Sequence, residues 1–298
     1  MQAHCPMSTI VFTPTSRTVS ALAAIALTAA LSACGSSSQH ERSISSGAAP
    51  VAHPGVTDRM PPGDGEALQG PAVSTPALGI VTAPDRTPAD RRFDGERRPA
   101  ELLTFLSVEP GSRVALLVAG VGYTAELLAR AVAPGGTVYA ENPGFVLASA
   151  EQAWSSRLAS PALKTVVRVD RELADPLPPE AKDLDLVVIN LVYHDAVWLG
   201  VDRDRMNRAV LGALKPGGKY VVIDHSARPG AGVTDARALH RIDEEVVRRE
   251  VESVGFRLVK EGNFLRNPSD TRDWSDSPDA TRERGDTSDR FALMFVRP

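Results

Sequence analysis

Two histidines follow predicted strands at positions where their side chains are expected to meet. His194 comes shortly after the fourth predicted strand and His225 directly after the fifth. Because neighbouring parallel strands end at the same edge of a sheet, both imidazoles are expected in one pocket. An imidazole titrates near neutral pH and suits general-base catalysis. His225 is therefore the first candidate for a base or for a group that orients a substrate, followed by Tyr193, His194 and Asp195. A structural role, such as bonding a carbonyl, is the alternative for each histidine.

A metal site is a second interpretation of the same region. Asp195, Asp224, His225 and His240 carry the oxygen and nitrogen atoms that divalent ions bind. However, no two of these histidines stand at a short metal-binding spacing, and His240 is placed to pair with Glu244 one helical turn later. We therefore expect no bound metal ion.

A turn containing two glycines follows the first predicted strand and leads into a helix. Gly120 and Gly122 would let backbone amides approach a ligand at the helix N-terminus. The run Gly120-Val121-Gly122-Tyr123-Thr124-Ala125 also matches the G-x-G-x-x-A dinucleotide fingerprint, with Glu141 about 20 residues further on. A lone match is weak, and no second substrate domain accompanies it, so a nicotinamide-dependent enzyme is the less favoured interpretation.

The elements that carry these residues alternate between strands and helices. Continuous apolar runs predict strands covered on both faces, as in parallel sheets. The last two strands have no helix between them, which indicates an antiparallel edge strand. The expected fold is α/β, with a seven-stranded, mostly parallel sheet and helices on both faces. The predicted strands are 113–118, 137–140, 165–169, 184–189, 219–223, 256–265 and 291–296.

Two segments after the fifth strand have distinct patterns. An amphipathic helix is predicted where apolar residues recur with the helical period, and Gly255 suits its C-cap. The polar segment 270–289, with a lone Trp274, is expected to be a solvated loop or, alternatively, a lid over a substrate pocket. The apolar helix positions are Leu239, Ile242, Val246, Val247, Val251 and Val254.

Over essentially the whole predicted domain, the chain resembles the class I S-adenosylmethionine-dependent methyltransferases, which have a Rossmann-like fold. The run Leu214-Lys215-Pro216-Gly217-Gly218, which leads into the fifth strand, is typical of that class. More narrowly, five motifs are similar to one bacterial family of predicted methyltransferases. They are Tyr193-His194-Asp195, Asp224-His225-Ser226-Ala227, Leu239-His240-Arg241-Ile242, Phe264-Leu265-Arg266-Asn267-Pro268 and Ser288-Asp289-Arg290-Phe291.

This resemblance implies that S-adenosyl-L-methionine binds beyond the carboxyl ends of the strands. It places the methionine part at the glycine turn and both ribose hydroxyls at Glu141. It places the adenine amine at Asp170 and the sulfonium opposite Asn190. Ordinary turn residues are the alternative for any one of these positions. The cofactor-binding residues implied are Gly120, Gly122, Tyr123, Glu141, Asn142, Asp170 and Asn190.

Two positions depart from the pattern of the class, which normally has an acid at Leu116 and a glycine at Val118. Valine disfavours a positive φ, and leucine removes a carboxylate near the cofactor's ammonium group. Each change is expected to weaken cofactor binding by about 1–3 kcal/mol. Two functions therefore stay open. One is a methyltransferase acting on a small molecule or a protein side chain, and the other is a non-catalytic binding or scaffold module.

The N-terminal segment is typical of an exported lipoprotein. An uncharged stretch rich in alanine and leucine, 18–33, follows Arg17. It ends at Leu31-Ser32-Ala33-Cys34, which resembles the bacterial lipobox. The similarity implies a signal peptide over 1–34 and a lipid anchor on Cys34, with the protein facing the periplasm. An ordinary cleaved signal and a cytoplasmic protein with a later start codon are the alternatives.

Composition sets the remaining limits. Residues 35–92 lack aromatic residues and are rich in proline and glycine, so we expect a disordered linker before a domain at 93–298. With 33 basic and 37 acidic residues and no basic run, nucleic acid is excluded as a partner. Both cysteines lie in the first 34 residues, which excludes a cysteine nucleophile in the domain.

Overall fold

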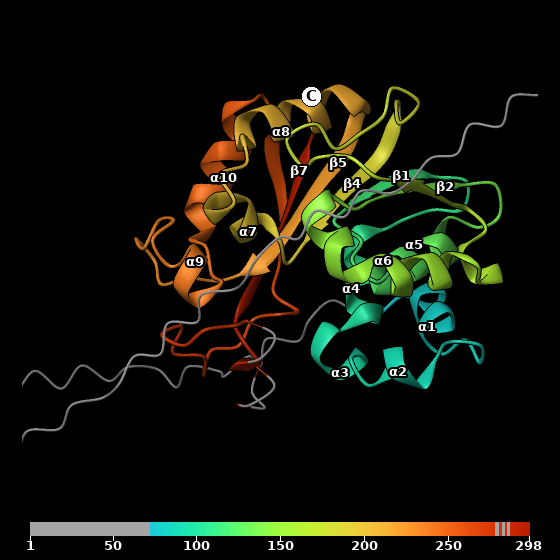
Figure 1. Ribbon diagram of the computed structural model, residues 1–298, viewed down its shortest axis with the longest axis horizontal. Helices are drawn as coiled ribbons and strands as arrows, with labels where there is room; N and C mark the ends of the chain where they lie inside the picture. The colour runs from blue at the N-terminus through green and yellow to red at the C-terminus, as the bar shows by residue number, and fades with distance from the viewer. Residues whose placement is uncertain (1–71, 278–279, 282–283, 285–286) are drawn as a thin grey trace, which may run out of the picture. The chain divides into compact units, whose positions relative to one another are not determined.

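The computed structural model describes residues 72–298, except 278–279, 282–283 and 285–286. Its seven strands form one sheet in the order β3-β2-β1-β4-β5-β7-β6 (Figure 1). The strands β1 to β5 pair in parallel, and β7 runs antiparallel to its neighbours β5 and β6. This confirms the fold class predicted from the sequence. The strands are β1 (Arg113–Leu117), β2 (Thr137–Glu141), β3 (Val166–Val169), β4 (Leu184–Asn190), β5 (Leu214–His225), β6 (Arg257–Gly262) and β7 (Arg290–Val296).

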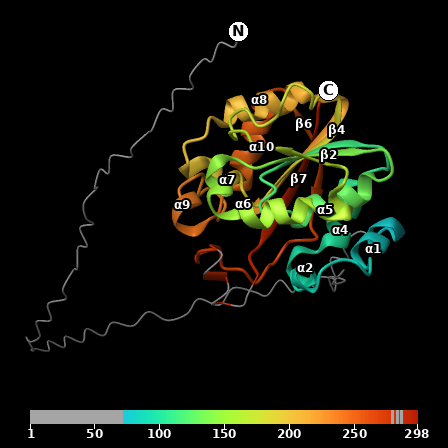
Figure 2. The ribbon, with the colours of Figure 1, turned by 45° about the vertical axis from the view of Figure 1, so that its right-hand side comes forward.

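Helices cover both faces of the sheet, as Figures 1 and 2 show. One apolar core lies under α4 (Pro99–Leu106), α5 (Tyr123–Val132) and α6 (Gly144–Leu158). The other lies under α8 (Arg203–Ala213) and α10 (Glu244–Ser253). The short helices α7 (Tyr193–Trp198) and α9 (Ala236–Leu239) follow β4 and β5, and the 3-10 turn η1 (Pro161–Leu163) precedes β3. No helix in the described part of the chain is long and apolar enough to cross a membrane.

The sequence placed residues 72–92 in a disordered linker, and the structure shows that this is wrong. They form α1 (Thr75–Val81) and α2 (Pro88–Arg91), followed by α3 (Asp94–Arg97). The signal peptide, the lipobox and linker residues 35–71 lie outside the described residues.

Polar contacts explain why composition missed these helices. The side chains of Ser74 and Thr87 cap α1 and α2 by accepting hydrogen bonds from backbone amides. Arg157 of α6 forms an ion pair of 2.6 Å with Asp90, whose carboxylate is almost fully buried. These polar contacts add to an apolar cluster in which Ala77 and Ile80 pack against residues of α4 and α5, so the segment folds without aromatic residues of its own.

The long helix predicted around 239–254 is broken into α9 and α10. His240 adopts a left-handed conformation with φ of 52°, which ends α9. The side chain of Asp243 then starts α10 by accepting from the amide of Glu245 at 3.1 Å. Between them, Ile242 donates its amide to the carbonyl of His225 at 3.0 Å. The break therefore brings His240 close to the carboxyl end of β5.

Candidate functional site

Two groups of residues that present polar side chains or backbone groups lie at the carboxyl ends of the strands. The first, called here the glycine-turn site, consists of Val118, Gly120, Glu141 and Asn142 around the ends of β1 and β2. The second, called the histidine cluster, follows β4 and β5. It consists of His194, Asp195, Asp224, His225 and His240.

Asn142 holds the glycine turn closed. The amide of Gly120 donates to Asn142 Oδ1 at 2.8 Å, and Asn142 Nδ2 donates back to the carbonyl of Gly120 at 3.0 Å. Gly122 has φ of 91°, and a Cβ atom there would lie 2.7 Å from side-chain atoms of both Trp154 and Arg157. Gly122 is therefore required by the close approach of α6.

Val118 adopts the backbone conformation that the class usually builds with glycine. Its φ is 56°, and a left-handed conformation costs a residue with a Cβ atom about 1–2 kcal/mol. Leu116 is only 1% exposed and packs in the core under α4, α5 and α6. A carboxylate at position 116 would thus be buried in an apolar core, whereas glycine at position 118 fits the observed turn.

Glu141 is a fully buried carboxyl group with one unpaired oxygen. Its Oε2 accepts from the amide of Val118 at 3.0 Å, while Oε1 has no hydrogen-bond partner among the described residues. Burial raises the pKa of Glu141 from 4.5 to about 8, against the opposing effect of the Val118 amide. The nearby Glu172 and Asp170 push this pKa further upward. The group is therefore largely protonated at neutral pH.

The other implied cofactor residues differ in whether their side chains already contact other residues of the protein. Tyr123 turns toward the N-terminal helices, where its hydroxyl donates to Asp94 at 2.7 Å. This contact leaves only the backbone of Tyr123 for a ligand at the turn. Asp170 is exposed and pairs with Arg168 at 2.9 Å. Asn190 is half-buried at the end of β4, and both Asp170 and Asn190 stay predictions.

Asp224 joins the two histidines that the sequence predicted to share a pocket. Its Oδ1 lies 2.7 Å from His194 Nδ1, and the backbone amides of His194 and His225 donate to the same carboxylate. The rings of His194 and His225 lie 5.6 Å apart in an edge-on arrangement. The fully buried Asp224 therefore orients the imidazole of His194 and holds the backbone at His225.

The other nitrogen of His194 faces two further polar groups. Its Nε2 lies 3.1 Å from Asp195 Oδ1 and 3.3 Å from His240 Nδ1. Burial lowers the pKa of His194, but the carboxylates of Asp224 and Asp195 outweigh it and raise this pKa to about 10. The sequence predicted a pair between His240 and Glu244, but Glu244 pairs with Arg266 at 2.6 Å, and the helix break places His240 in the cluster.

His225 has the surroundings of a neutral base. Its Nδ1 lies 2.8 Å from Ser288 Oγ and against the carboxylate of Asp276. Burial lowers the pKa of His225, although Asp276 opposes this effect. In the neutral ring with a proton on Nδ1, the unprotonated nitrogen is Nε2.

The polar segment after β6 packs over the histidine cluster, so the expected solvated loop is wrong for its described part. Arg241 and Asp270 form an ion pair of 2.7 Å in which both side chains are fully buried. Asp289 is also buried and pairs with Arg272 at 2.8 Å. The segment brings Asp276 against His225, and its role as a lid over a substrate pocket stays a prediction.

Comparison with known proteins was made by sequence and by structure. No protein-family model matches the chain, and no curated protein matches it. Among solved structures, it is similar to a SAM-dependent methyltransferase from Aquifex aeolicus, with a TM-score of 0.50 and 15% identity over 70% of this chain and 97% of that one. The chain has the fold of the class I methyltransferases. At this level of identity, the likeness concerns the fold alone.

Two further methyltransferase structures are similar. One is the Haloferax volcanii protein solved with the Trm112 methyltransferase activator, with a TM-score of 0.49, 16% identity and coverage of 75% of this chain and 98% of that chain. The other is a SAM-dependent O-methyltransferase from Thermotoga maritima, with a TM-score of 0.44, 18% identity and coverage of 75% and 71%.

Within this methyltransferase fold, Tyr193 does not belong to the histidine cluster. Its side chain is fully buried, and its hydroxyl donates to Glu250 at 2.8 Å and accepts from Asn207 at 2.9 Å. Consecutive residues of a helix point in different directions, so Tyr193 and His194 diverge although they are neighbours in sequence. The catalytic role predicted for Tyr193 does not fit this position.

A small polar cavity lies beside the histidine cluster. It holds about 80 Å³ and is lined by Ser288, Glu96 and three arginines: Arg98, Arg266 and Arg290. Ser288 connects this cavity directly to His225. The excess of basic residues suits a small anionic group.

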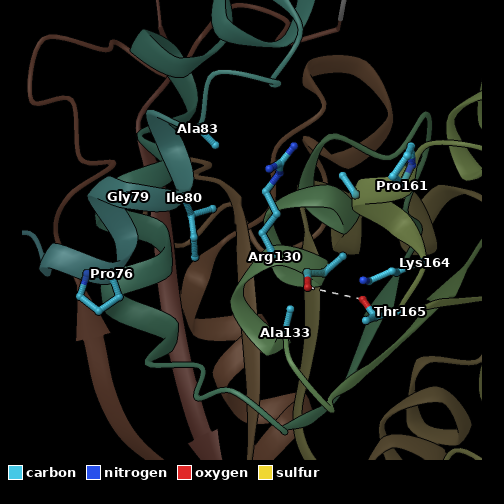
Figure 3. Close-up of a pocket in the computed structure, with 11 residues that line it drawn as sticks. Pro76, Gly79, Ile80, Ala83, Arg130, Ala133, Pro161, Lys164 and Thr165 are labelled. Carbon is cyan, nitrogen blue, oxygen red and sulfur yellow. Dashed lines mark hydrogen bonds between the residues drawn. The ribbon is translucent and has the colours of Figure 1, made fainter.

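A larger cavity, of about 410 Å³, lies at the amino ends of the strands (Figure 3). It is bounded by α1, the end of α5 and the segment before β3, and Ile80, Ala133 and Pro161 contribute to its lining. Thr165 donates to the carbonyl of Ala129 at 3.4 Å on its wall. No predicted site residue lines this cavity, so we assign it no catalytic role.

Proposed function

We propose that this protein is an S-adenosyl-L-methionine-dependent methyltransferase with its cofactor at the glycine-turn site. The observation that carries the proposal is Glu141, whose buried Oε1 lacks a partner at the end of β2. A ribose hydroxyl can donate to this oxygen, or accept from it when the carboxyl group is protonated. The left-handed turn at Val118 and the exposed carboxylate of Asp170 also suit the cofactor.

The bound cofactor would supply an activated methyl group for an in-line displacement. The protein's main contribution to such a reaction is to position the two reactants. Asn142 holds the turn at Gly120, Asp224 orients the imidazole of His194, and Ser288 contacts the imidazole of His225. His225, with its lowered pKa, is the group best suited to accept a proton from an acceptor hydroxyl or carboxyl group.

We propose a small acceptor that carries an anionic group. The cavity beside Ser288 holds only about 80 Å³, and Arg98, Arg266 and Arg290 line it. Arg290 is buried, and its contacts with Glu96 are long, at 3.4 Å. An anionic group in this cavity would give Arg290 a stronger partner and would hold the acceptor beside His225.

A non-catalytic binding or scaffold module is the second candidate, and one observation favours it. Asn142 already occupies both the amide and the carbonyl of Gly120, the turn residue expected to face the cofactor. In such a module the turn would stay closed, and the cofactor would not bind.

Calorimetric titration of S-adenosylmethionine and S-adenosylhomocysteine into the full-length protein distinguishes the two candidates. We expect binding that Glu141→Ala weakens at least tenfold, since one or more hydrogen bonds to a charged or polar ligand are lost. Val118→Gly should tighten binding severalfold, because it removes a side chain from the turn. Glu172→Gln, a neighbouring exposed acid, serves as the control and should change affinity little.

Two results would contradict the methyltransferase proposal. One is the absence of binding at millimolar ligand by a protein whose circular dichroism shows that it is folded. The other is equal affinity of the wild-type and Glu141→Ala proteins, which would place the ligand elsewhere. The first result would favour the scaffold module.

We also propose that the protein is exported and anchored to the membrane through lipid on Cys34. The lipobox-like run that ends at Cys34 supports this, with the uncharged stretch before it. Expressed in a bacterial host, the wild-type protein should fractionate with membranes, and Cys34→Ala should move it to the soluble fraction. If the wild-type protein is found in the cytoplasmic fraction and Cys34→Ala does not change this, the result would contradict the lipid anchor and support the cytoplasmic alternative.

A further inference from the structure

Three atoms of the histidine cluster that could ligate a metal ion form a nearly regular triangle. His194 Nε2 lies 3.1 Å from Asp195 Oδ1 and 3.3 Å from His240 Nδ1. The third side, from His240 Nδ1 to Asp195 Oδ1, measures 3.6 Å. In a tetrahedral site with metal–ligand distances of about 2.05 Å, ligand atoms are about 3.3 Å apart. The three atoms therefore already have the spacing of one face of a metal tetrahedron.

The surroundings of the triangle hold two of its members in place. His194 Nδ1 bonds to the buried Asp224 at 2.7 Å, so Nε2 is directed at the triangle. Asp195 Oδ1 also accepts from Trp198 Nε1 at 2.9 Å. A carboxylate behind a ligating histidine and a donor behind a ligating carboxylate are the usual second layer of protein metal sites.

The donor set indicates which ions fit. Two imidazole nitrogens and one carboxylate oxygen suit Zn²⁺, Co²⁺ and similar transition ions better than Ca²⁺ or Mg²⁺, which prefer all-oxygen sites. The side chains of Asp195 and His240 are 22% and 27% exposed, so the triangle reaches solvent. Three protein ligands and an open fourth position are typical of a catalytic site rather than a closed structural one.

We propose that His194 Nε2, Asp195 Oδ1 and His240 Nδ1 bind one divalent transition-metal ion, with Zn²⁺ as the best fit, and that the ion displaces the proton between His194 Nε2 and Asp195 into solvent. The proposal departs from the expectation from sequence that no metal ion is bound. The fourth position would take a water or an oxygen of a bound molecule, whose proton the ion would make easier to remove. The inference concerns metal binding alone and does not depend on methyl transfer.

The sequence offers Asp195 and His240 as possible ligands but does not show that they meet His194, because the ligands come from two separate segments. His194 and Asp195 lie in the first turn of α7, and His240 lies at the end of α9. The left-handed conformation of His240 ends α9. The chain then returns to the end of β5, where the amide of Ile242 donates to the carbonyl of His225.

Metal titration of the full-length protein, stripped with a chelator and free of S-adenosylmethionine, tests the proposal. We expect calorimetry to show one Zn²⁺ per chain with micromolar affinity or tighter. Co²⁺ should give the intense visible absorption bands of a tetrahedral nitrogen and oxygen site. His240→Ala and Asp195→Ala should each weaken binding at least 100-fold, because two ligands rarely hold these ions tightly.

His225→Asn is the matched control, since His225 lies in the same cluster but outside the triangle. It should leave metal affinity within about threefold of wild type, provided that circular dichroism shows each variant to be folded. Failure of the folded wild-type protein to bind Zn²⁺ or Co²⁺ would overturn the proposal. So would unchanged tight binding in His240→Ala, which would place the ion elsewhere. Because the titration contains no cofactor, its outcome is independent of the S-adenosylmethionine titration.

Discussion

Replacing Arg241 with alanine should lower the free energy of unfolding by about 3–5 kcal/mol. Its guanidinium pairs with Asp270 at 2.7 Å, and neither side chain is exposed to solvent. It also donates to the carbonyls of Ser226 and Trp274, each at 3.0 Å. The alanine variant would leave the Asp270 carboxylate buried without its charge partner, which is the most costly way to break such a pair.

Denaturant unfolding followed by circular dichroism measures this effect. Arg208→Ala is the control, because Arg208 and Asp204 form an exposed pair of 2.8 Å on α8. Its loss should leave the free energy of unfolding nearly unchanged, because exposed ion pairs contribute little. A loss below about 1 kcal/mol in Arg241→Ala would show that the segment over the histidine cluster does not depend on this ion pair.

The protein should become less stable as pH rises from about 4.5 to 8 because of Glu141. The pKa of Glu141 is about 8 in the folded protein and near 4.5 in the unfolded chain. A raised pKa means that the folded state binds the proton more tightly, so its contribution to stability is complete below pH 4.5. That contribution disappears as pH rises through 8, and the difference corresponds to about 3–5 kcal/mol.

Glu141→Gln should remove this pH dependence, since glutamine does not ionise. Unfolding free energies at pH 5 and pH 8.5 would show a steeper decline for wild type than for Glu141→Gln. Glu109→Gln, at an exposed position before β1, should keep the wild-type slope. Parallel profiles for wild type and Glu141→Gln would mean that Glu141 ionises in the folded protein as easily as in water.

The strands and their order along the chain were predictable because each strand has a local signal in the sequence, a short apolar run. Runs such as 114–118 and 221–223 are apolar throughout, a pattern expected of a strand covered on both faces. Once the parallel sheet is inferred, the residues after each strand must lie at one edge. This is why the approach of His194 to His225 could be predicted without coordinates.

Other parts depended on contacts between segments distant in sequence. The helices in 72–92 are held by partners such as Arg157 on α6, which composition cannot reveal. Gly122 faces Trp154 because α6 packs there, and that distance is a property of the assembled layers.

The sequence by itself therefore determined the sheet, the edge at which the polar residues collect and the meeting of His194 with His225. The tertiary structure alone decided that His240 joins them, that Tyr193 points away and that Glu141 is buried with an unpaired oxygen. The physical reason is the distance along the chain over which each kind of information acts. Apolar periodicity acts over a few neighbouring residues, whereas the direction and burial of a polar side chain depend on every segment that packs against it.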